Sequence, residues 1–144
     1  MLSKKTQYAF KALTYMAERK KEGPLLISEI SKKKKIPLKF LENILLELKK
    51  AGLLESKKGK GGGYFLVKNP TEVNLMQVMR LIDGPIALLP CVSLNYYEHC
   101  DECRNEKTCG IRDSLIAVRD ETLNILKQST LAKIVKRERQ LGHK

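Results

Sequence analysis

All four cysteines of this 144-residue chain fall between positions 91 and 109, with the spacing C-x8-C-x2-C-x5-C. Thiolates are preferred ligands of zinc and of iron–sulfur clusters, and a C-x2-C pair is a general feature of such sites. The spacing alone does not choose between the two metals. We therefore predict a metal site whose candidate ligands are Cys91, Cys100, Cys103 and Cys109, with His99 as an alternative donor.

Two other uses of the cysteines stay open. Without metal, Cys100 and Cys103 could act as a redox switch through thiol–disulfide exchange. A structural disulfide framework is disfavoured, since we expect a chain in a reducing compartment. Catalysis is not indicated either: the chain has 2 histidines, one of them His143 in the tail, and no Ser/His/Asp set or paired acidic motif accompanies the thiols.

The first half of the chain has the pattern of a helix-turn-helix. The predicted elements are helices over 3–22, 28–34 and 37–50, with an extended piece at 25–27. Ser28 is the predicted N-cap of the second helix, and Pro37 suits the first position of the third. The third helix has a predicted buried side made of Leu38, Leu41, Leu45 and Leu48. Gly52 is placed to end this helix in a left-handed conformation.

A glycine-rich hairpin follows the third helix. Two short strands, over 53–57 and 64–67, are joined by the sequence Lys58-Gly59-Lys60-Gly61-Gly62-Gly63. The glycines permit positive φ in a tight turn, and lysines beside them allow close approach to phosphates or to a minor groove. A helix for a DNA groove beside a basic hairpin is a winged helix-turn-helix, and its expected partner is double-stranded DNA.

The predicted DNA contacts fall into two classes. Phosphate contacts position the protein, whereas side chains in the first turns of the third helix read base edges. The run Lys32–Lys35 is either a solvated face or a phosphate contact, and its place before that helix favours the latter; Phe40 is either a thymine contact or part of the core. The predicted set is Ser28, Lys35, Pro37, Lys39, Phe40, Glu42, Asn43, Lys58, Lys60 and Gly61.

The charge distribution supports this interpretation. Residues 1–68 contain 17 Lys and Arg against 6 Asp and Glu, a net charge of +11, out of a total of +12 for the chain. A positive field concentrated on the helix and hairpin is typical of a nucleic-acid footprint. The aliphatic runs are too short for a membrane span, and the first residues lack the apolar stretch of a signal peptide. We expect a soluble cytoplasmic protein that does not bind a membrane.

The second half contains two further helix signals. Asn74 and Gln77 form the pattern of a capping box that opens a helix to about Ile82. A helix over about 110–127 carries a heptad-like seam, and a last short helix is capped by Ser129 or Thr130 before a frayed end at 137–144. The seam packs either within the chain or between two chains. A homodimer is favoured, because two copies of the DNA-reading helix suit a palindromic site. Its residues are Ile111, Leu115, Val118, Thr122 and Ile125.

Taken together, these segments resemble the IscR/NsrR/CymR-type (Rrf-two family) bacterial regulators over nearly the whole chain. The resemblance is carried by Gln7-Tyr8-Ala9, Ile27-Ser28-Glu29-Ile30, Ile36 to Glu42, Leu45 to Leu53, the glycine-rich segment Lys58 to Tyr64 and the cysteines before a long helix. It implies a homodimeric winged-helix transcriptional regulator with crossed long helices. For members with the cysteine cluster it also implies an iron–sulfur cofactor that senses iron–sulfur status, nitric oxide or redox state.

The cysteines only partly match the family pattern. Cys91 and Cys109 match its first and last ligands, and Cys103 keeps the usual gap before Cys109. The first gap is longer than in familiar members and contains Cys100, so either cysteine could be the middle ligand, or all four could bind. Some relatives complete the shell with an acidic side chain from the partner's first helix, where this chain has Gln7, a poor ligand. The resemblance therefore leaves open whether the cluster is 2Fe–2S or 4Fe–4S.

The expected fold is mainly α with a small β-hairpin wing, a winged helix-turn-helix followed by a long C-terminal dimerisation helix. The expected domains are a DNA-binding domain over 1–84, a cysteine-rich sensor loop over 85–109, and a dimerisation helix with tail over 110–144. The expected function is control of transcription through the state of the cysteines. A metal-free thiol switch or a zinc-stabilised regulator of the same fold is the alternative.

Overall fold

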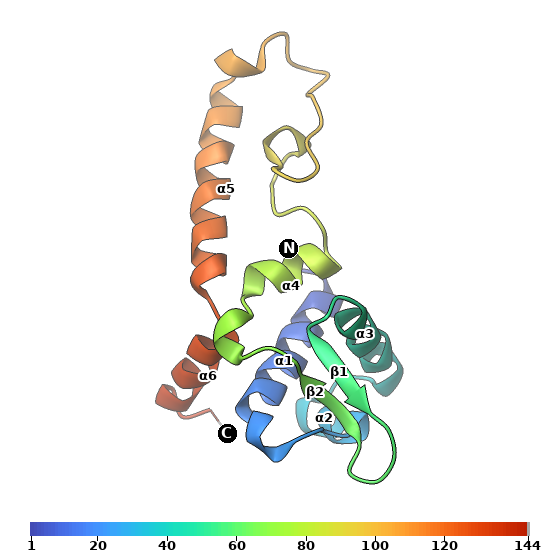
Figure 1. Cartoon of the computed structure of the whole chain (residues 1–144). Coiled ribbons are helices and arrows are strands. Elements are labelled where there is room, and N and C mark those ends of the chain that lie inside the picture. Colours follow the sequence, from blue (N-terminus) through green and yellow to red (C-terminus); the bar gives the residue numbers. More distant parts are fainter. Residues whose placement is uncertain (144) are drawn as a thin grey trace.

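The computed structural model describes residues 1–143 and shows a head from which one long helix projects (Figure 1). The helices within that range are α1 (Lys4–Glu18), α2 (Ile27–Lys34), α3 (Leu38–Lys50), α4 (Leu75–Ile82), α5 (Gly110–Gln128) and α6 (Leu131–Gln140). The strands β1 (Leu54–Lys57) and β2 (Gly63–Leu66) form an antiparallel hairpin, and short 3₁₀ turns lie at Lys20–Glu22, Pro70–Glu72, Pro90–Val92 and Glu106–Thr108. The predicted fold class is confirmed.

The core of the head surrounds α1, which packs against α2, α3, α4 and α6. Burying each large aliphatic side chain contributes roughly 1.5–3 kcal/mol, so this cluster supplies most of the driving force for folding. Its fully buried large side chains include Leu13, Met16, Ile30, Leu41, Ile44, Leu45, Leu48, Leu54, Val73, Val78 and Leu131. Helix α6, far along the chain, is therefore part of the same core as α1.

Two local predictions about the helix-turn-helix were wrong. Helix α2 begins at Ile27 and its N-cap is Leu26, so Ser28 lies within the first turn and caps nothing. Leu38 is 44% exposed, whereas Ile44 takes its place among the buried residues of α3. Both errors arise because the position of the chain entering a helix depends on tertiary packing. At the other end of α3 the prediction holds, since Gly52 has a φ of 83°.

The hairpin pairs Leu54 with Leu66 and Lys57 with Gly63. The predicted extended piece is present as a single bridge, in which Leu25 and Tyr64 exchange two backbone hydrogen bonds of 2.8 Å. At two positions of the hairpin the neighbouring backbone comes too close for any residue but glycine. A Cβ at position 62 would collide with the carbonyl oxygen of Lys57, and a Cβ at position 63 would collide with the carbonyl oxygen of Leu25. The wing is therefore tied to the head at its base, with its tip left free.

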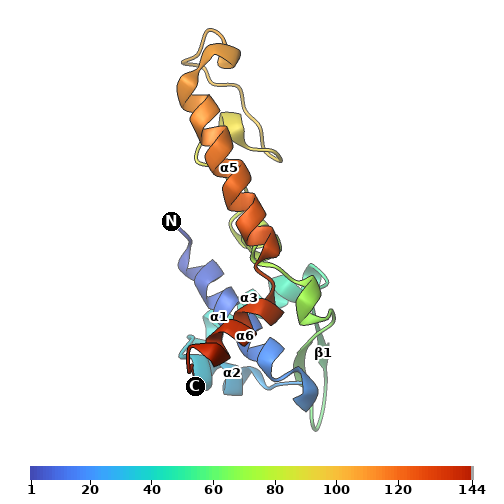
Figure 2. The same cartoon turned by 90° about the vertical axis from the view of Figure 1, so that its left-hand side faces the viewer.

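The projecting arm consists of α5 and the loop 85–109, which runs beside it (Figures 1 and 2). The predicted capping box is present at the start of α4: Asn74 and Gln77 exchange two hydrogen bonds of 3.0 Å. At the end of α5 the chain returns to the head, where the Leu131 amide donates to the Val73 carbonyl at 2.9 Å. Thr130, one of the two predicted caps, is the N-cap of α6.

Helix α6 continues to Gln140, so the predicted fraying from 137 was wrong for its first residues. Leu131 and Val135 face α1 and are buried, which explains why the helix continues. The predicted frayed end also includes Lys144, which lies outside the described residues. Over 1–143, none of the helices is both long enough and apolar enough to cross a membrane.

Candidate nucleic-acid interface and cysteine loop

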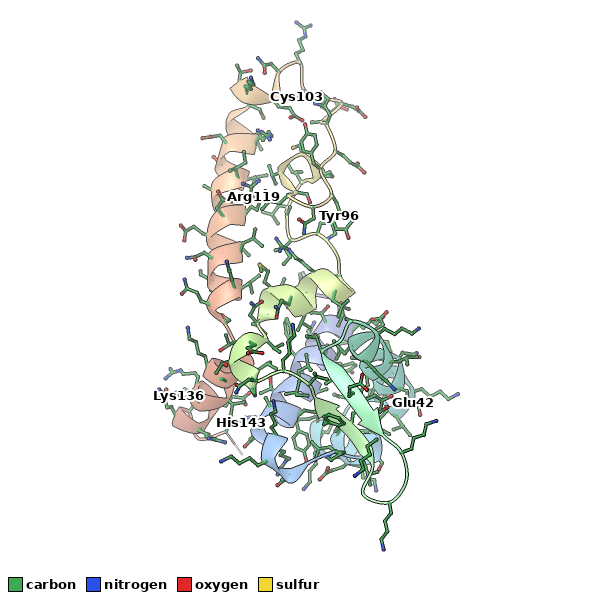
Figure 3. The ribbon with its side chains drawn as sticks, in the orientation of Figure 1. Glu42, Tyr96, Cys103, Arg119, Lys136 and His143 are labelled. Atoms are coloured by element: carbon green, nitrogen blue, oxygen red, sulfur yellow. The ribbon has the colours of Figure 1, made fainter. Side chains whose placement is uncertain are left out.

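Helix α3 presents a polar face outward from the head. Its buried side, with Leu41 and Leu48, packs into the core, and the opposite side exposes Lys39, Glu42 and Asn43. Figure 3 shows Glu42 at the edge of the head, beside the wing. The side chains of this face have the donors and acceptors needed to read base edges in a major groove.

The exposed face of α3 also contains a residue that the sequence prediction missed. Leu46 is 45% exposed, and it lies one turn after Asn43 on the same outward side. Leu46 lies off the predicted buried stripe of Leu38, Leu41, Leu45 and Leu48, so the leucine spacing already places it away from the core. A large apolar side chain on this face is suited to contact a thymine methyl group.

Every residue predicted to contact DNA is exposed in the structure. This set comprises Ser28, Lys35, Pro37, Lys39, Phe40, Glu42, Asn43, Lys58, Lys60 and Gly61. Phe40 is 36% exposed and packs edge-on against Tyr8, with ring centroids 5.5 Å apart and planes at 83°. It therefore has one edge in the protein and another toward solvent, and its role in DNA contact stays a prediction.

Helix α3 is held on two sides by different elements. On one side Lys5 of α1 forms an ion pair with Glu47 at 2.7 Å, close to the contact between Tyr8 and Phe40. On the other side the Lys49 ammonium donates to the Ser56 hydroxyl of β1 at 2.6 Å. The outward face of α3 thus lies between α1 and the wing.

The turn between α2 and α3 carries the lysine run. Lys35 has a φ of 54°, and it is the one residue other than glycine with positive φ among those described. The Ser31 hydroxyl donates to the Ile36 carbonyl at 2.6 Å and closes the turn. A left-handed conformation is uncommon for a lysine, and the closed turn sets the backbone of the exposed Lys35 directly before α3.

The cysteine loop places three thiols near one another. Burial raises the pKa of Cys103, and the neighbouring thiols of Cys109 and Cys100 raise it further. Cys109 is the N-cap of α5, and its Sγ accepts the Arg112 amide at 3.4 Å, which lowers the pKa of Cys109. Figure 3 shows Cys103 at the far end of the arm.

The four predicted ligands are not assembled around one point. Cys91 is buried in the turn Pro90–Val92, while the other three cysteines are half-buried. Across positions 1–143, no group of three or more His, Cys, Asp and Glu side chains converges closely enough to hold a metal ion. Cys103 thus has Cys109 and Cys100 as neighbours, but the predicted ligand set is not assembled in the described residues.

Glu106 is a central acceptor of the loop that no sequence pattern indicated. Its carboxylate accepts the Tyr97 hydroxyl at 2.5 Å and the Cys100 amide at 3.1 Å, and these two bonds lower the pKa of Glu106. His99, the predicted alternative ligand, has its Nδ1 3.0 Å from the same carboxylate, so its ring has a partner within the loop. Glu106 thus ties residues 97–100 to the segment just before α5.

Two arginines of α5 bind the loop to the helix. Arg112 Nε donates to the Cys91 carbonyl at 3.2 Å, and Arg119 Nη1 donates to the Val92 carbonyl at 2.9 Å. Figure 3 shows Arg119 between α5 and the loop. Because Arg112 also holds the Cys109 sulfur through its amide, it connects the first and last cysteines to the start of α5.

The predicted dimer seam is largely unpacked within the chain. Ile111 is 69% exposed, Val118 46% and Ile125 61%, while Leu115 and Thr122 are half-buried. Helix α5 has no buried residue among those described. An exposed stripe of large apolar side chains marks an interaction surface.

Residues 2–137 match the Rrf2 family, described as "Iron-dependent Transcriptional regulator". The chain belongs to the Rrf2 family of transcriptional regulators. Among curated relatives, a putative Rrf2-like HTH-type transcriptional regulator of Rhodobacter capsulatus is 46% identical over 78% of this chain and 77% of its own length. IscR of Pectobacterium atrosepticum is 33% identical over 71% of this chain and 62% of its own length.

Solved structures of Rrf2-type regulators have the same fold. CymR, described as the global cysteine regulator of B. subtilis, has a TM-score of 0.79 at 25% identity, covering 95% of this chain and 97% of that one. IscR of T. potens has a TM-score of 0.74 at 23% identity, covering 95% and 87%. These relatives are regulators, so the predicted family, winged-helix fold and absence of enzymatic activity are confirmed.

Proposed function

We propose that this Rrf2-family regulator binds duplex DNA sequence-specifically, with α3 in the major groove and the wing against the backbone beside it. The observation that carries this proposal is the exposed polar face of α3, which lies between basic elements of the half of the chain with net charge +11. A helix that reads bases needs an outward face with donors and acceptors and positive charge beside it. A DNA-binding regulator works where the chromosome lies, so we place the protein in the cytoplasm.

The exposed residues divide into two roles. Lys35, Lys58 and Lys60 are proposed phosphate contacts, and Ser28, Pro37 and Gly61 bring the backbone close to the duplex. Lys39, Glu42 and Asn43 are proposed base contacts, with Phe40 against a thymine methyl group. The glycines beside the wing lysines, Gly59 with a φ of 88° and Gly61 with a φ of 76°, support a tip that can approach the sugar-phosphate chain.

We further propose a homodimer through the seam of α5, which supports two reading heads on one duplex. Three members of that seam are large apolar side chains exposed in the single chain, and a second copy supplies an identical surface for them. In this arrangement residues 1–84 form the DNA-binding domain, 85–109 the sensor loop, and 110–144 the dimerisation helix and tail.

The cysteines are the proposed sensor, with an iron–sulfur cluster (2Fe–2S or 4Fe–4S) as the favoured cofactor. The proposal is supported by the donor chemistry, since Cys103 has the thiols of Cys109 and Cys100 as neighbours, and by the iron-dependent description of the family. When bound, such a cluster supplies a group that responds to oxidants, nitric oxide or iron supply. Cys91 would have to move toward the other three to complete the ligand set.

The chain itself suggests how the thiols act on the helix. Arg112 holds both the Cys91 carbonyl and the Cys109 sulfur, so a change in ligation displaces the first turn of α5. A metal-free switch between these thiols, or a zinc site, would use the same connection. Anaerobic reconstitution with absorption spectra and metal analysis distinguishes the three; a colourless protein with one tightly bound zinc refutes the cluster.

DNA binding is tested by selecting bound sequences from a random duplex pool and measuring their affinity at several salt concentrations. We expect one enriched, palindromic sequence. Lys58→Ala should lower the log–log salt slope by about 0.9, the value for one phosphate, without changing the sequence, whereas Asn43→Ala should relax the sequence preference without changing the slope. Failure to enrich any sequence would refute the proposed function.

A further inference from the structure

We propose that α1 is a third DNA-contacting element, in which Lys4 and Lys11 bind phosphates on the side of α3 opposite the wing. This inference rests on the proposed DNA-binding function and extends it to a helix that lies outside the helix-turn-helix. The ligand is the sugar-phosphate backbone of a DNA duplex.

Helix α3 lies between two other elements, the wing and α1. A helix in a major groove, which is about 12 Å wide, has a phosphate backbone on each side. The contact between Lys49 and Ser56 places the wing on one side, and the contacts of Glu47 with Lys5 and Phe40 with Tyr8 place α1 on the other. With the wing at one backbone, α1 lies on the side of the other.

On that side α1 has two lysines, Lys4 and Lys11, without an ion-pair partner among the described residues. The Lys4 ammonium lies 5.2 Å from the centroid of the Tyr8 ring, and the Lys11 ammonium lies 6.0 Å from it. Both lysines are exposed, and neither forms an ion pair with any residue that the structure describes. Lys5, one residue after Lys4, differs because Glu47 neutralises it at 2.7 Å.

The Tyr8 ring gives these cations a defined place. A ring face attracts an ammonium group without neutralising its charge, so a lysine held there keeps its donors for a phosphate. The same ring packs against Phe40 in the first turns of α3. The Tyr8 ring therefore connects Lys4 and Lys11 to the helix that carries the proposed base-reading residues. Phosphate contacts made from such a position would set the register of the protein on the duplex.

The cations of α1 are continuous with the lysine run. Lys11 lines one hollow with Lys33, Lys34 and Lys35. Within this hollow, Glu138 of α6 is the single acidic residue among the described side chains that line it. Lys4 and Lys11 share the Tyr8 ring, and Lys11 shares the hollow with the lysine run, so these cations are connected from α1 to the turn before α3.

The test measures salt-dependent binding of the full chain to a fluorescein-labelled 25-base-pair duplex of random sequence, by fluorescence anisotropy. Non-specific binding depends on phosphate contacts alone, so no operator is needed. We expect the double variant Lys4→Gln/Lys11→Gln to lower the log–log slope by about 1.8 per protomer, since each phosphate that a lysine neutralises adds about 0.9. Both lysines are exposed, so its thermal melt should match that of the wild type.

The matched control is Lys127→Gln/Lys136→Gln, which removes the same charge from exposed positions at the end of α5 and on α6. Figure 3 shows Lys136 on the side of the head away from the wing. An unchanged slope in the Lys4/Lys11 variant overturns the inference, and so does an equal decrease in the control, since net charge would then explain both. If the wild type binds no duplex at any salt concentration, it is the proposed function that fails.

Discussion

The apolar stripe of α5 gives the most direct test of the proposed dimer, through the substitution Ile125→Ser. Ile125 is 61% exposed in the single chain. Fully burying such a side chain stabilises by roughly 1.5–3 kcal/mol, so covering the exposed part contributes about 1–2 kcal/mol. A two-fold interface contains the residue twice, which gives about 2–4 kcal/mol for the dimer. At about 1.4 kcal/mol per tenfold change, the dimer dissociation constant should rise roughly 30- to 700-fold.

Sedimentation equilibrium over a range of protein concentrations measures this constant. The matched control is Asn124→Ser, which alters the adjacent exposed residue on the polar side of α5 and should leave the constant unchanged. Thermal melting at a concentration where both variants are monomeric should give the same midpoint for each, because neither side chain is in the core. A dimer of wild-type stability in the Ile125 variant would refute the stripe as the interface.

Three further predictions concern the head. Gly62→Ala should distort the wing, because its Cβ would meet the Lys57 carbonyl, at a cost of about 1–3 kcal/mol; duplex affinity should fall while far-UV circular dichroism keeps its helical signal. Leu131→Ala should lower the free energy of unfolding in urea by about 2–5 kcal/mol, whereas a small effect would show that α6 is not part of the core. Burial raises the pKa of Asp83, but hydrogen bonds from the Ser3 hydroxyl and amide outweigh it and leave that pKa below its usual value. The resulting stability is present above about pH 3.9, the unfolded value, and is lost as the pH falls through the folded value; the drop in melting temperature from pH 7 to pH 3 should be smaller in Ser3→Ala, and an equal drop would contradict this account.

The features that the sequence predicts correctly are those that neighbouring residues determine. The capping box of Asn74 and Gln77, the left-handed Gly52 and the paired strands all depend on a few consecutive residues. The N-cap assigned to Ser28 fails although its composition is suitable, because Leu25 is fixed by its bridge to Tyr64 and the helix begins earlier. Leucine spacing alone likewise could not show that Leu38 is exposed.

The candidate site shows the same division. Exposure of the predicted DNA contacts follows from helix periodicity, and clustering of the cysteines is visible in their spacing. The contact between Tyr8 and Phe40 joins two helices, so no local sequence pattern predicts it. The hydrogen bonds of Glu106 are equally unpredictable, because it is one acidic residue among several in a polar loop. Which thiols meet also depends on the path of the loop, which places Cys103 beside Cys109 and leaves Cys91 in a separate turn.

The base of the arm has a mechanical consequence. Residues 73–75 are bonded to the segment where α5 meets α6, through the Leu75 amide to the Ser129 carbonyl at 3.0 Å and the Leu131 amide to Val73 at 2.9 Å. The α5 end of the arm is therefore bonded to the segment that opens α4. Helices α4 and α6 both pack against α1, so the base of the arm is connected through them to the helix that flanks α3.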